Sequence, residues 1–400
     1  MKRTVTPAEL EQPLVAYRDA VDAIVGAFDL LNPIDVAVAD ARGLVIAQSV
    51  TAEHDVPGFD NSAMDGYAVR SADTTTVGVA LRLTGDIPAG TADAHPIGAG
   101  TAATIMTGAP LPPGADAVVP WEDTDRGADI VTLNVAVPAG KHVRPRGEDL
   151  RAGDVVIEAG TELRAVHLGV LASLGRTHVR AHPRPRVAVL STGDELIEPG
   201  GSLRPGAVFD ANRALLRAMC EQAGARVTSD ALIGDDPDRI AAWLKEADAD
   251  LIVTSGGASV GEHDWIRDIL EREGTLRLWR VAIKPGKPLA FGRIGSTPVL
   301  GLPGNPGSAF VCAHVFVQPA IRKMAGRDPG ARSIRARLGE AIKGSPNRTS
   351  FCRVAIEDGV AHPLPAQSSV VLSNLIPAQG FAIVAPGGRP AGSDVTVELL

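Results

Sequence analysis

The spacing of hydrophobic residues changes along this chain, and its middle part alternates between two periods. From Arg186 to about Gly326, short apolar runs typical of buried strands alternate with segments whose apolar residues recur at helical spacing. Strands are predicted at Val187–Leu190, Val227–Ile233 and Leu251–Thr254, and helices at residues 211–223 and 237–247. Regular alternation of this kind is typical of a mostly parallel sheet covered by helices. We therefore predict a doubly wound α/β domain in this region.

The parts of the chain before and after this region show β patterns. Between Ile34 and about Arg180, short Val-rich runs are interrupted by Gly and Pro, and after Arg327 the chain returns to short strand-like runs. Residues 7–31 instead show helical spacing that Pro33 closes, which predicts one or two short helices. The expected fold class is multidomain, α/β plus β-rich domains, with a small β domain at the C-terminus.

The composition narrows the classes of protein to consider. The 400 residues are 45% hydrophobic, which is enough for several packed cores, and 43 Gly and 30 Pro favour tight turns over long helices. A net charge of -8 argues against nucleic acid or a membrane surface as the main ligand, although a local basic pocket can still bind an anion. An anionic substrate must therefore be met by local positive charge.

The spacing of the cysteines fits a reducing compartment, and the chain shows no long apolar run. The three cysteines, Cys220, Cys312 and Cys352, lie far apart without CxxC pairing, so their spacing gives no metal site. Cys220 and Cys312 fall in helical patterns, which favours burial in a core. No segment of signal-peptide type and no run of about 18 apolar residues occurs, so we expect a cytoplasmic protein without a membrane span.

Three glycine-rich polar turns follow apolar strands in the second half of the chain, at Thr254–Asp264, Lys284–Pro288 and Gly301–Pro306. In open α/β sheets, ligands bind outside the carboxyl ends of the strands, where such turns lie. Glycine lets backbone amides approach an anion, and Pro306 fits the first position of a helix whose N-terminus would face that anion. The lysines and carboxylates of the turns suit phosphate oxygens and a divalent cation. We predict that the turns form one anion site.

Carboxylates follow two further strands of the same sheet. Asp194 and Glu195 come after the strand at Val187–Leu190, where either could bind a cation or cap the next turn. Asp236 precedes Pro237 and is expected to cap a helix, while Asp235 remains open to both roles.

The last turns carry the remaining candidates. Asp264 could cap the helix that follows it, bind magnesium, or do both through water, whereas His263 beside it is expected to be incidental. Lys284 and Lys287 bracket Pro285-Gly286, a rigid spacing that favours an anion contact over a solvated surface position, and Arg280 could add a further positive charge.

Two polar clusters lie far upstream of these turns. Residues 59–70 contain Asp60 and Asp65 with Asn and Ser between them, and Thr107 lies in a Gly-Pro turn. Both fit ordinary turn clusters, and their spacing alone does not attach them to the anion site.

Taken together, these motifs closely resemble the molybdopterin molybdenumtransferases of molybdenum cofactor biosynthesis, including the gephyrin E domain. The resemblance spans most of the chain and is looser over the last seventy or so residues. It is carried, in order, by Asp60-Asn-Ser-Ala-Met-Asp-Gly-Tyr-Ala-Val-Arg70, Ile105-Met-Thr-Gly-Ala-Pro110, Arg146-Gly-Glu-Asp149, Ser191-Thr-Gly-Asp-Glu195, Thr254–Asp264, Lys284-Pro-Gly-Lys-Pro288 and Gly301-Leu-Pro-Gly-Asn-Pro306.

The resemblance implies a homodimer of four-domain subunits, with the active cleft between the α/β domain of one subunit and the Asp60–Asp65 region of the other. The implied domains are a linking β-rich domain at residues 26–50 and 145–174, an inserted β-rich domain at 51–144 carrying Asp60 and Thr107, an α/β molybdopterin-binding domain at 1–25 and 175–328, and a C-terminal β domain at 329–400.

The implied reaction inserts molybdenum from molybdate into adenylylated molybdopterin and releases AMP, with Mg2+ as cofactor. Expected partners are a molybdopterin adenylyltransferase and molybdoenzymes, with no nucleic acid and no membrane. The implied catalytic residues are Asp60, Thr107, Asp149, Glu195, Asp235, Asp264 and Lys284, of which Glu195, Asp235 and Asp264 would hold the metal. The implied substrate-binding residues are Ser255, Gly256, Gly257, Ser259, Arg280, Lys287, Pro303, Gly304, Asn305, Pro306, Arg353 and Ser369.

Two positions depart from the usual family pattern, and two other functions remain open. Gly307 stands where relatives more often carry Val, and Arg280 replaces a commoner Lys, which keeps the charge but adds a planar fork. A non-catalytic molybdopterin-binding scaffold would be favoured by a degraded site, whereas here the ligand-type side chains are present. A molybdopterin adenylyltransferase is permitted by the α/β domain alone, but the chain outside that domain argues against it.

Overall fold

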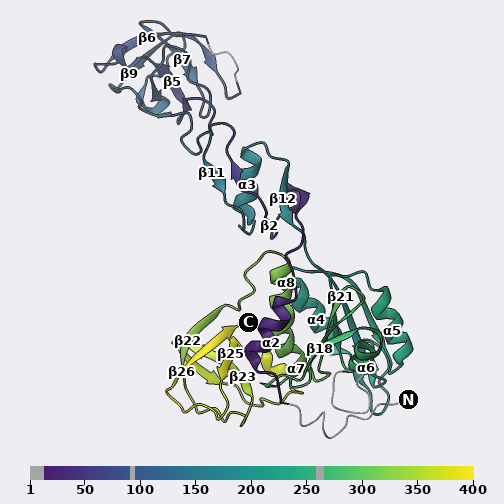
Figure 1. Cartoon of the computed structure of the whole chain (residues 1–400). Coiled ribbons are helices and arrows are strands. Elements are labelled where there is room, and N and C mark those ends of the chain that lie inside the picture. The colour runs from purple at the N-terminus through teal and green to yellow at the C-terminus, as the bar shows by residue number, and fades with distance from the viewer. Residues whose placement is uncertain (1–12, 91–94, 258–264) are drawn as a thin grey trace. The chain divides into compact units, whose positions relative to one another are not determined.

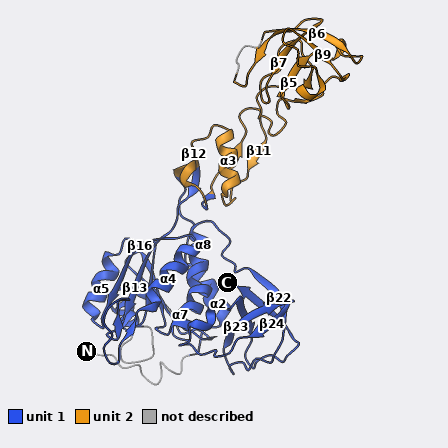
Figure 2. Cartoon of the chain, turned by 180° about the vertical axis from the view of Figure 1, so that it is seen from behind, with its two compact units in different colours: residues 1–34, 43–45, 180–400 blue, residues 35–42, 46–179 orange. Residues whose placement is uncertain are grey.

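A computed structural model describes residues 13–90, 95–257 and 265–400 (Figure 1). The chain forms two compact units (Figure 2): residues 1–34, 43–45 and 180–400 form unit 1, and residues 35–42 and 46–179 form unit 2. A three-stranded sheet has the order β1 (Ile34–Ala37), β12 (His178–His182) and β2 (Val45–Ile46). The predicted class, α/β with β-rich parts, is confirmed, while the finer division into four domains stays a prediction.

A six-stranded sheet forms the centre of unit 1, in the order β16-β13-β17-β21-β20-β18. Its strands are β13 (Arg186–Thr192), β16 (Arg226–Ile233), β17 (Leu251–Ser255), β18 (Thr275–Trp279), β20 (Ala290–Ile294) and β21 (Thr297–Leu302). Neighbours from β16 to β21 are parallel, and β20 is antiparallel to both β21 and β18. All strands except β20 therefore run in one direction, which confirms a mostly parallel sheet.

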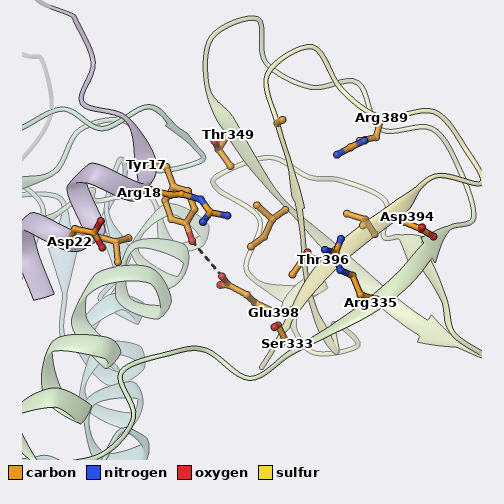
Figure 3. Close-up of a pocket in the computed structure, with 14 residues that line it drawn as sticks. Tyr17, Arg18, Asp22, Ser333, Arg335, Thr349, Arg389, Asp394, Thr396 and Glu398 are labelled. Atoms are coloured by element: carbon orange, nitrogen blue, oxygen red, sulfur yellow. Dashed lines mark hydrogen bonds between the residues drawn. The ribbon is translucent and has the colours of Figure 1, made fainter.

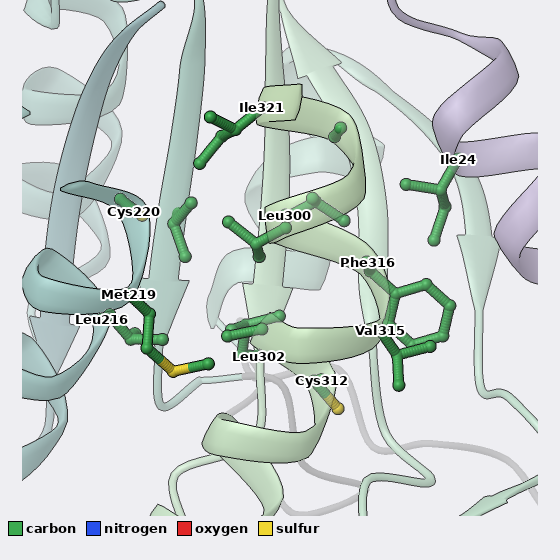
Figure 4. Close-up of a cluster of buried hydrophobic side chains, with 14 of the residues drawn as sticks. Ile24, Leu216, Met219, Cys220, Leu300, Leu302, Cys312, Val315, Phe316 and Ile321 are labelled. Carbon is green, nitrogen blue, oxygen red and sulfur yellow. The ribbon is translucent and has the colours of Figure 1, made fainter. Parts of the chain in front are cut away.

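Alternate residues of the central strands enter two different cores. In β13, Val187 and Val189 face one core, while Ala188 and Leu190 face the other, because successive side chains of a strand point to opposite faces. Helices α2 (Tyr17–Gly26), α4 (Ala211–Gln222), α7 (Pro306–Cys312) and α8 (Gln318–Met324), with the π-helix η4 (Ala313–Val317), supply the first core (Figure 4), and α5 (Pro237–Glu246) with α6 (Trp265–Glu273) supply the second. Both faces of the sheet are covered, as a doubly wound fold requires.

The helices agree with the hydrophobic pattern except at some ends. The helix expected within residues 7–31 spans Tyr17–Gly26, and residues 1–12 lie outside the described part. Pro306 occupies the first turn of α7, as predicted, and the helical path continues through η4, where Phe316 is fully buried. Cys220 and Cys312 are buried in this core, as expected.

The C-terminal residues form a small closed barrel. Its strands are β22 (Ser333–Leu338), β23 (Thr349–Glu357), β24 (Val360–Pro363), β25 (Gly380–Val384) and β26 (Asp394–Leu399). The pairing of β23 with β25 closes the ring, so the strands leave no open edge among themselves.

One expectation about the α/β sheet is wrong. The strand before the turn at Lys284–Pro288 is β19 (Ile283–Lys284), and it pairs with β23 of the barrel instead of extending the α/β sheet. The Thr349 N–H donates to the Ala282 carbonyl at 2.9 Å, which fixes this register. Lys284, the last residue of β19, therefore lies where the chain of the α/β domain joins the barrel.

Unit 2 is built from β strands and one described α-helix, α3 (Ala165–Ser173). Its main sheet has the order β8-β5-β7-β6-β9, with β5 (Gly66–Val69), β6 (Val79–Ile87), β7 (Thr101–Ile105), β8 (Ala117–Pro120) and β9 (Ile130–Leu133). Two strand pairs join β4 (Asn61–Ser62) to β10 (Val143–Arg144) and β3 (Val50–Thr51) to β11 (Val155–Ile157). Unit 2 also contains the 3-10 helices η1 (Val38–Asp40), η2 (Ser71–Asp73) and η3 (Trp121–Asp123). The remaining short elements belong to unit 1 and are β14 (Leu196–Ile197), β15 (Val208–Phe209) and the 3-10 helix η5 (Ser373–Leu375).

Within the described ranges, none of the helices combines the length and the apolar character needed to cross a bilayer.

A buried arginine connects the barrel to helix α7. Arg353 on β23 is 1% exposed, and its Nη1 donates to the Ser368 carbonyl at 3.2 Å. The Gly307 N–H donates to the Ser369 carbonyl at 2.8 Å, and a Cβ at position 307 would overlap with Arg353 Nη2. The glycine that departs from the family pattern is therefore required by the packing of this arginine.

Gly307→Val should lower the free energy of unfolding by about 1–3 kcal/mol, because the added side chain overpacks a site that has no free space. Urea unfolding measures the change. In the double variant Gly307→Val/Arg353→Met, part of the loss should disappear because the guanidinium is gone.

Gly85→Val is the matched control, since nothing lies within 4 Å of a Cβ there, and its effect should stay within about 0.5 kcal/mol. A Gly307→Val variant as stable as the unmodified protein would contradict this account of the packing.

Candidate active site

A cleft of about 390 Å³ opens at the carboxyl ends of β13, β17 and β21. These are the strand ends at which an open α/β sheet binds its ligands. Seven of the predicted site residues line the cleft: Glu195, Ser255, Gly256, Pro303, Gly304, Asn305 and Pro306. Two of the three polar turns therefore line one cleft, to which the third turn contributes Pro288.

Gly256 determines how closely the strand ends approach. It follows β17 with φ +90, and a Cβ there would overlap with the Thr192 carbonyl at the end of β13. Its N–H donates to the Leu302 carbonyl at the end of β21, at 3.2 Å. Only glycine fits this combination of positive φ and close backbone approach, so the floor of the cleft is made of backbone.

Asn212, which the sequence pattern placed only in a helix, joins two walls of the cleft. Its Nδ2 donates to Ser255 Oγ at 2.7 Å and to the Gly304 carbonyl at 2.6 Å. The side chain is 8% exposed, lines the cleft, and its Oδ1 accepts no hydrogen bond from a described residue. Asn212 therefore holds the turn after β17 against the turn after β21.

Asp210 places Asn212 at the cleft. It caps α4 by accepting the Arg213 N–H at 3.1 Å, and it also accepts the Ser191 hydroxyl at 3.0 Å. Through Ser191 the cap is attached to β13 itself. An Asp that caps a helix directly after a strand was the one sequence signal that could have placed this helix start at the sheet edge.

The acidic candidates follow β13 and β16. Glu195 lies in the cleft and its carboxylate makes no hydrogen bond or ion pair with a described residue. The Asp235 N–H donates to Asp194 Oδ1 at 2.9 Å, which connects the two strand ends. Asp236 accepts the Asp238 and Arg239 N–H groups, each at 3.1 Å, so its predicted role as a helix cap is confirmed.

Ser259 and Asp264, together with His263, lie outside the described residues. Within the described part of the chain, no group of three or more His, Cys, Asp and Glu side chains is arranged to hold a metal ion.

The third polar turn gathers positive charge beside the cleft. Lys287 is half-buried, and its pKa is lowered by burial first and then by the charges of Arg280 and Arg348. Pro288 lines the cleft, whereas Arg280, Lys284 and Lys287 do not. The cationic turn therefore borders the cleft.

Backbone and glycine geometry define this turn. The Val281 N–H donates to the Lys287 carbonyl at 2.9 Å, and Arg280 has φ +69. Gly286 has φ +108, and a Cβ there would lie 2.6 Å from Cys312 Sγ. The turn is thus packed against the core through its glycine.

Three further predicted residues lie outside the cleft lining. Gly257, with φ +64, continues the turn that Gly256 begins. Ser369 Oγ accepts a hydrogen bond from Asn305 Nδ2 at 3.2 Å, so it contacts a lining residue. Arg353 lies behind Gly307 and supports the same turn.

The remaining predicted residues, Asp60, Thr107 and Asp149, belong to unit 2. Thr107 donates to Asp65 Oδ1 through its N–H and its hydroxyl, each at 2.7 Å. These two hydrogen bonds lower the pKa of Asp65, the backbone bond contributing most. The Gly108 N–H donates to the Ser62 carbonyl at 2.8 Å, so the two upstream clusters are joined directly.

The third upstream motif joins the same cluster. Asp60 Oδ1 accepts the Arg146 N–H at 2.7 Å, and the Arg146 side chain forms an ion pair with Asp55. The Asp149 N–H donates to the Val56 carbonyl at 3.0 Å. The structure therefore joins three upstream motifs to one another and adds Asp55 as a supporting residue.

Asn212→Ala should lower the free energy of unfolding by about 1–3 kcal/mol, because Ser255 and Gly304 lose their buried donor. Amide hydrogen exchange should become faster in the two turns that Asn212 joins. Gln222→Ala, an exposed change in the same helix, should stay within about 0.5 kcal/mol. Unchanged exchange in Asn212→Ala would mean that the turns hold without this side chain.

Three family models match successive parts of the chain. Residues 15–175 match the MoeA N-terminal region (domain I and II), residues 188–323 match a probable molybdopterin binding domain, and residues 335–400 match the MoeA C-terminal region (domain IV). The cleft lies within the second of these matches.

Named relatives agree with these models. The molybdopterin molybdenumtransferase 2 of Mycobacterium tuberculosis is 42% identical over 339 residues, covering 82% of this chain and 84% of the relative. The molybdopterin molybdenumtransferase of Haemophilus influenzae is 40% identical over 294 residues, covering 72% of each chain.

A solved structure extends the similarity to the whole fold. The molybdopterin biosynthesis MoeA protein of Pyrococcus horikoshii superposes with a TM-score of 0.82 at 30% identity, covering 97% of this chain and 99% of the other. Since sequence and fold agree over most of the length, the chain belongs to the molybdopterin molybdenumtransferase family.

Proposed function

We propose that this protein inserts molybdenum from molybdate into adenylylated molybdopterin and releases AMP. The observation that carries the proposal is the cleft at the ends of β13, β17 and β21, which lies in the segment that matches a probable molybdopterin binding domain. Relatives that are 40% and 42% identical over the aligned residues are named molybdopterin molybdenumtransferase. Water would attack a phosphorus atom of the phosphoanhydride bond, which breaks and releases AMP. The two thiol sulfurs of the substrate would bond to molybdenum in place of two molybdate oxygens, which leave as water with the thiol protons.

The cleft supplies what an anionic substrate needs. Gly256 and Gly304 place the backbone at the surface of the cleft, and the turn with Lys284 and Lys287 adds positive charge at its border. Asn212 and Gly256 hold these groups in fixed positions, so the site does not have to reorganise during the reaction. Binding and positioning are therefore the main contributions of the chain.

Covalent catalysis by cysteine is disfavoured in this protein. All three cysteines are buried, and burial raises the pKa of Cys220 to about 12 and that of Cys352 to about 11. Burial also raises the pKa of Cys312. Because the thiolate is the nucleophile, none of these groups is available for attack on the substrate.

We assign a magnesium ion to the acidic side of the cleft, held by Glu195, Asp235 and Asp264. Glu195 lines the cleft and its carboxylate carries no ion pair with a described residue, and hard oxygen donors fit this cation. Magnesium typically takes one or two carboxylates, with water and substrate phosphates completing its shell. When bound, the ion would neutralise phosphate charge.

Asp60, Thr107 and Asp149 are proposed to act from the partner subunit of a homodimer. The hydrogen bonds of Asp60 with Arg146 and of Thr107 with Asp65 hold both residues in a fixed cluster, which suits a substrate-orienting surface. A molybdopterin adenylyltransferase would supply the substrate, and cytoplasmic molybdoenzymes would take the product.

Incubation with adenylylated molybdopterin and magnesium should release AMP only when molybdate is added, and Glu195→Gln should slow this release by about 10- to 100-fold. The reason is the loss of one oxygen ligand on the acidic side of the cleft. AMP is quantified by chromatography.

Asp236→Asn is the matched control, because it makes the same chemical change beside the cleft while asparagine still caps α5. Binding of substrate without molybdate-dependent release would favour a scaffold, and consumption of ATP with molybdopterin would favour an adenylyltransferase.

Molybdate affinity should fall as the pH rises through the lowered pKa of Lys287. A lysine is charged only below its pKa, so a lowered pKa removes this positive charge at a lower pH than for an ordinary lysine. Lys287→Arg keeps the charge throughout and should move the alkaline decrease to higher pH. Calorimetric titration across the alkaline range measures this, and identical profiles for the two proteins would exclude Lys287 from the site.

A further inference from the structure

A second cavity in unit 1 has no role in the proposed reaction. It has a volume of about 620 Å³ and lies between helix α2 and the barrel strands β22, β25 and β26 (Figure 3). It shares no lining residue with the cleft at the ends of β13, β17 and β21. Its volume is in the range of cavities that hold small organic ligands.

Three guanidinium groups surround this cavity from three different segments. Arg18 comes from α2, Arg335 from β22, and Arg389 from the loop between β25 and β26. In Figure 3 the charged ends of all three point into the space between the helix and the strands. None of the three side chains makes a hydrogen bond or an ion pair with a residue in the described ranges.

The acidic residue closest to the centre of the cavity is already engaged. Glu398 accepts a hydrogen bond from the Tyr17 hydroxyl at 3.4 Å and contacts His314 Nε2 at 3.1 Å. Burial and, next, the charge of Glu398 raise the pKa of Tyr17, so this phenol stays protonated and keeps donating. Glu398 thus joins α2 to the barrel and does not pair with the arginines.

Two further carboxylates line the cavity without facing the guanidinium groups. In Figure 3, Asp22 lies on the far side of Arg18, and the Asp394 carboxylate points away from Arg335 and Arg389. Neither forms an ion pair with a described residue. The donors of the three arginines are therefore directed at the space between them and are not used by the three carboxylates of the lining.

This arrangement favours a ligand with more than one oxyanion group. Each guanidinium presents a planar fork of donors that fits a phosphate or a carboxylate, and none of the three forms an ion pair with the carboxylates of the same lining. Val21 and Ile383 add an apolar wall, which an inorganic ion alone would leave uncovered.

We propose that this cavity binds a small organic anion that carries two or three phosphate or carboxylate groups, held by Arg18, Arg335 and Arg389. The ligand would connect α2 to the barrel from the open side, as Glu398 does from the inside. The proposal does not depend on the reaction at the cleft, because the two sites are lined by different residues.

The two tyrosines of the chain allow a test at the site itself. Tyr17 lines the cavity, whereas Tyr67 is 5% exposed and belongs to unit 2. The full chain is labelled with 3-fluorotyrosine, and its two fluorine resonances are assigned with Tyr67→Phe. Tripolyphosphate and citrate are titrated separately, so that a phosphate ligand is distinguished from a carboxylate ligand.

The expected result is a saturable shift of the Tyr17 resonance with one or both anions and no shift of the Tyr67 resonance. Arg335→Gln/Arg389→Gln should weaken the affinity at least tenfold, since two of the three guanidinium groups are lost. Arg332→Gln/Arg337→Gln is the control, because it removes the same charge from residues outside the lining and should leave the affinity unchanged.

The proposal is overturned if neither anion shifts the Tyr17 resonance at millimolar concentration, or if the shift persists in the Arg335→Gln/Arg389→Gln variant. Equal weakening in the control variant would also overturn it, because the effect would then follow net charge and not the cavity. The Tyr67 resonance and the melting temperature of each variant verify that it is folded.

Discussion

The close backbone approach at Gly256 is the constraint on which the geometry of the cleft depends. A side chain at this position would displace the end of β17 from Thr192 at the end of β13. Because Gly256 also donates to Leu302, the same residue fixes the end of β21. The width of the cleft is therefore determined by main-chain contacts, which no side-chain rotation can relax.

The two cores, one on each face of the sheet, keep the strand ends at the cleft in place. Alternate residues of β13 and β17 are buried in the two cores. A shift of either strand by one residue would therefore move apolar side chains out of the core in which they pack. The barrel adds a second support, since Arg353 contacts the first turn of α7 at Gly307. A residue of the C-terminal barrel thereby stabilises a turn that the α/β sheet presents to the cleft.

The sequence predicted the local parts of this architecture well and the non-local parts poorly. Helices α4 and α5 end within a residue of their predicted bounds, because apolar spacing and an Asp before Pro are local signals. The pairing of β19 with β23 was missed because it joins segments that lie far apart along the chain. Strand pairing of this kind is set by the packed barrel and not by the two residues of β19.

The same limit applied to the site. The glycine turns identified the cleft because glycine is required there by the backbone, but Asn212 carried no signal beyond that of a helical residue. Spacing alone did not attach Asp60 and Thr107 to the anion site, and the structure joins their two motifs to one another through Ser62 and Asp65. The positions taken from the family resemblance for Ser259 and Asp264 stay predictions, as both fall outside the described residues.

The position of α2 in the core has a consequence for the order of events during synthesis. Ala20 and Ile24 pack beside Phe316, and the Lys323 ammonium donates to the Val25 carbonyl at 3.0 Å. At about 5–20 residues per second, a ribosome needs on the order of 15–60 s to make the intervening chain. All of unit 2 is synthesised before most of unit 1. The apolar face of α2 therefore cannot pack against η4 and α8 until these last core helices have been synthesised.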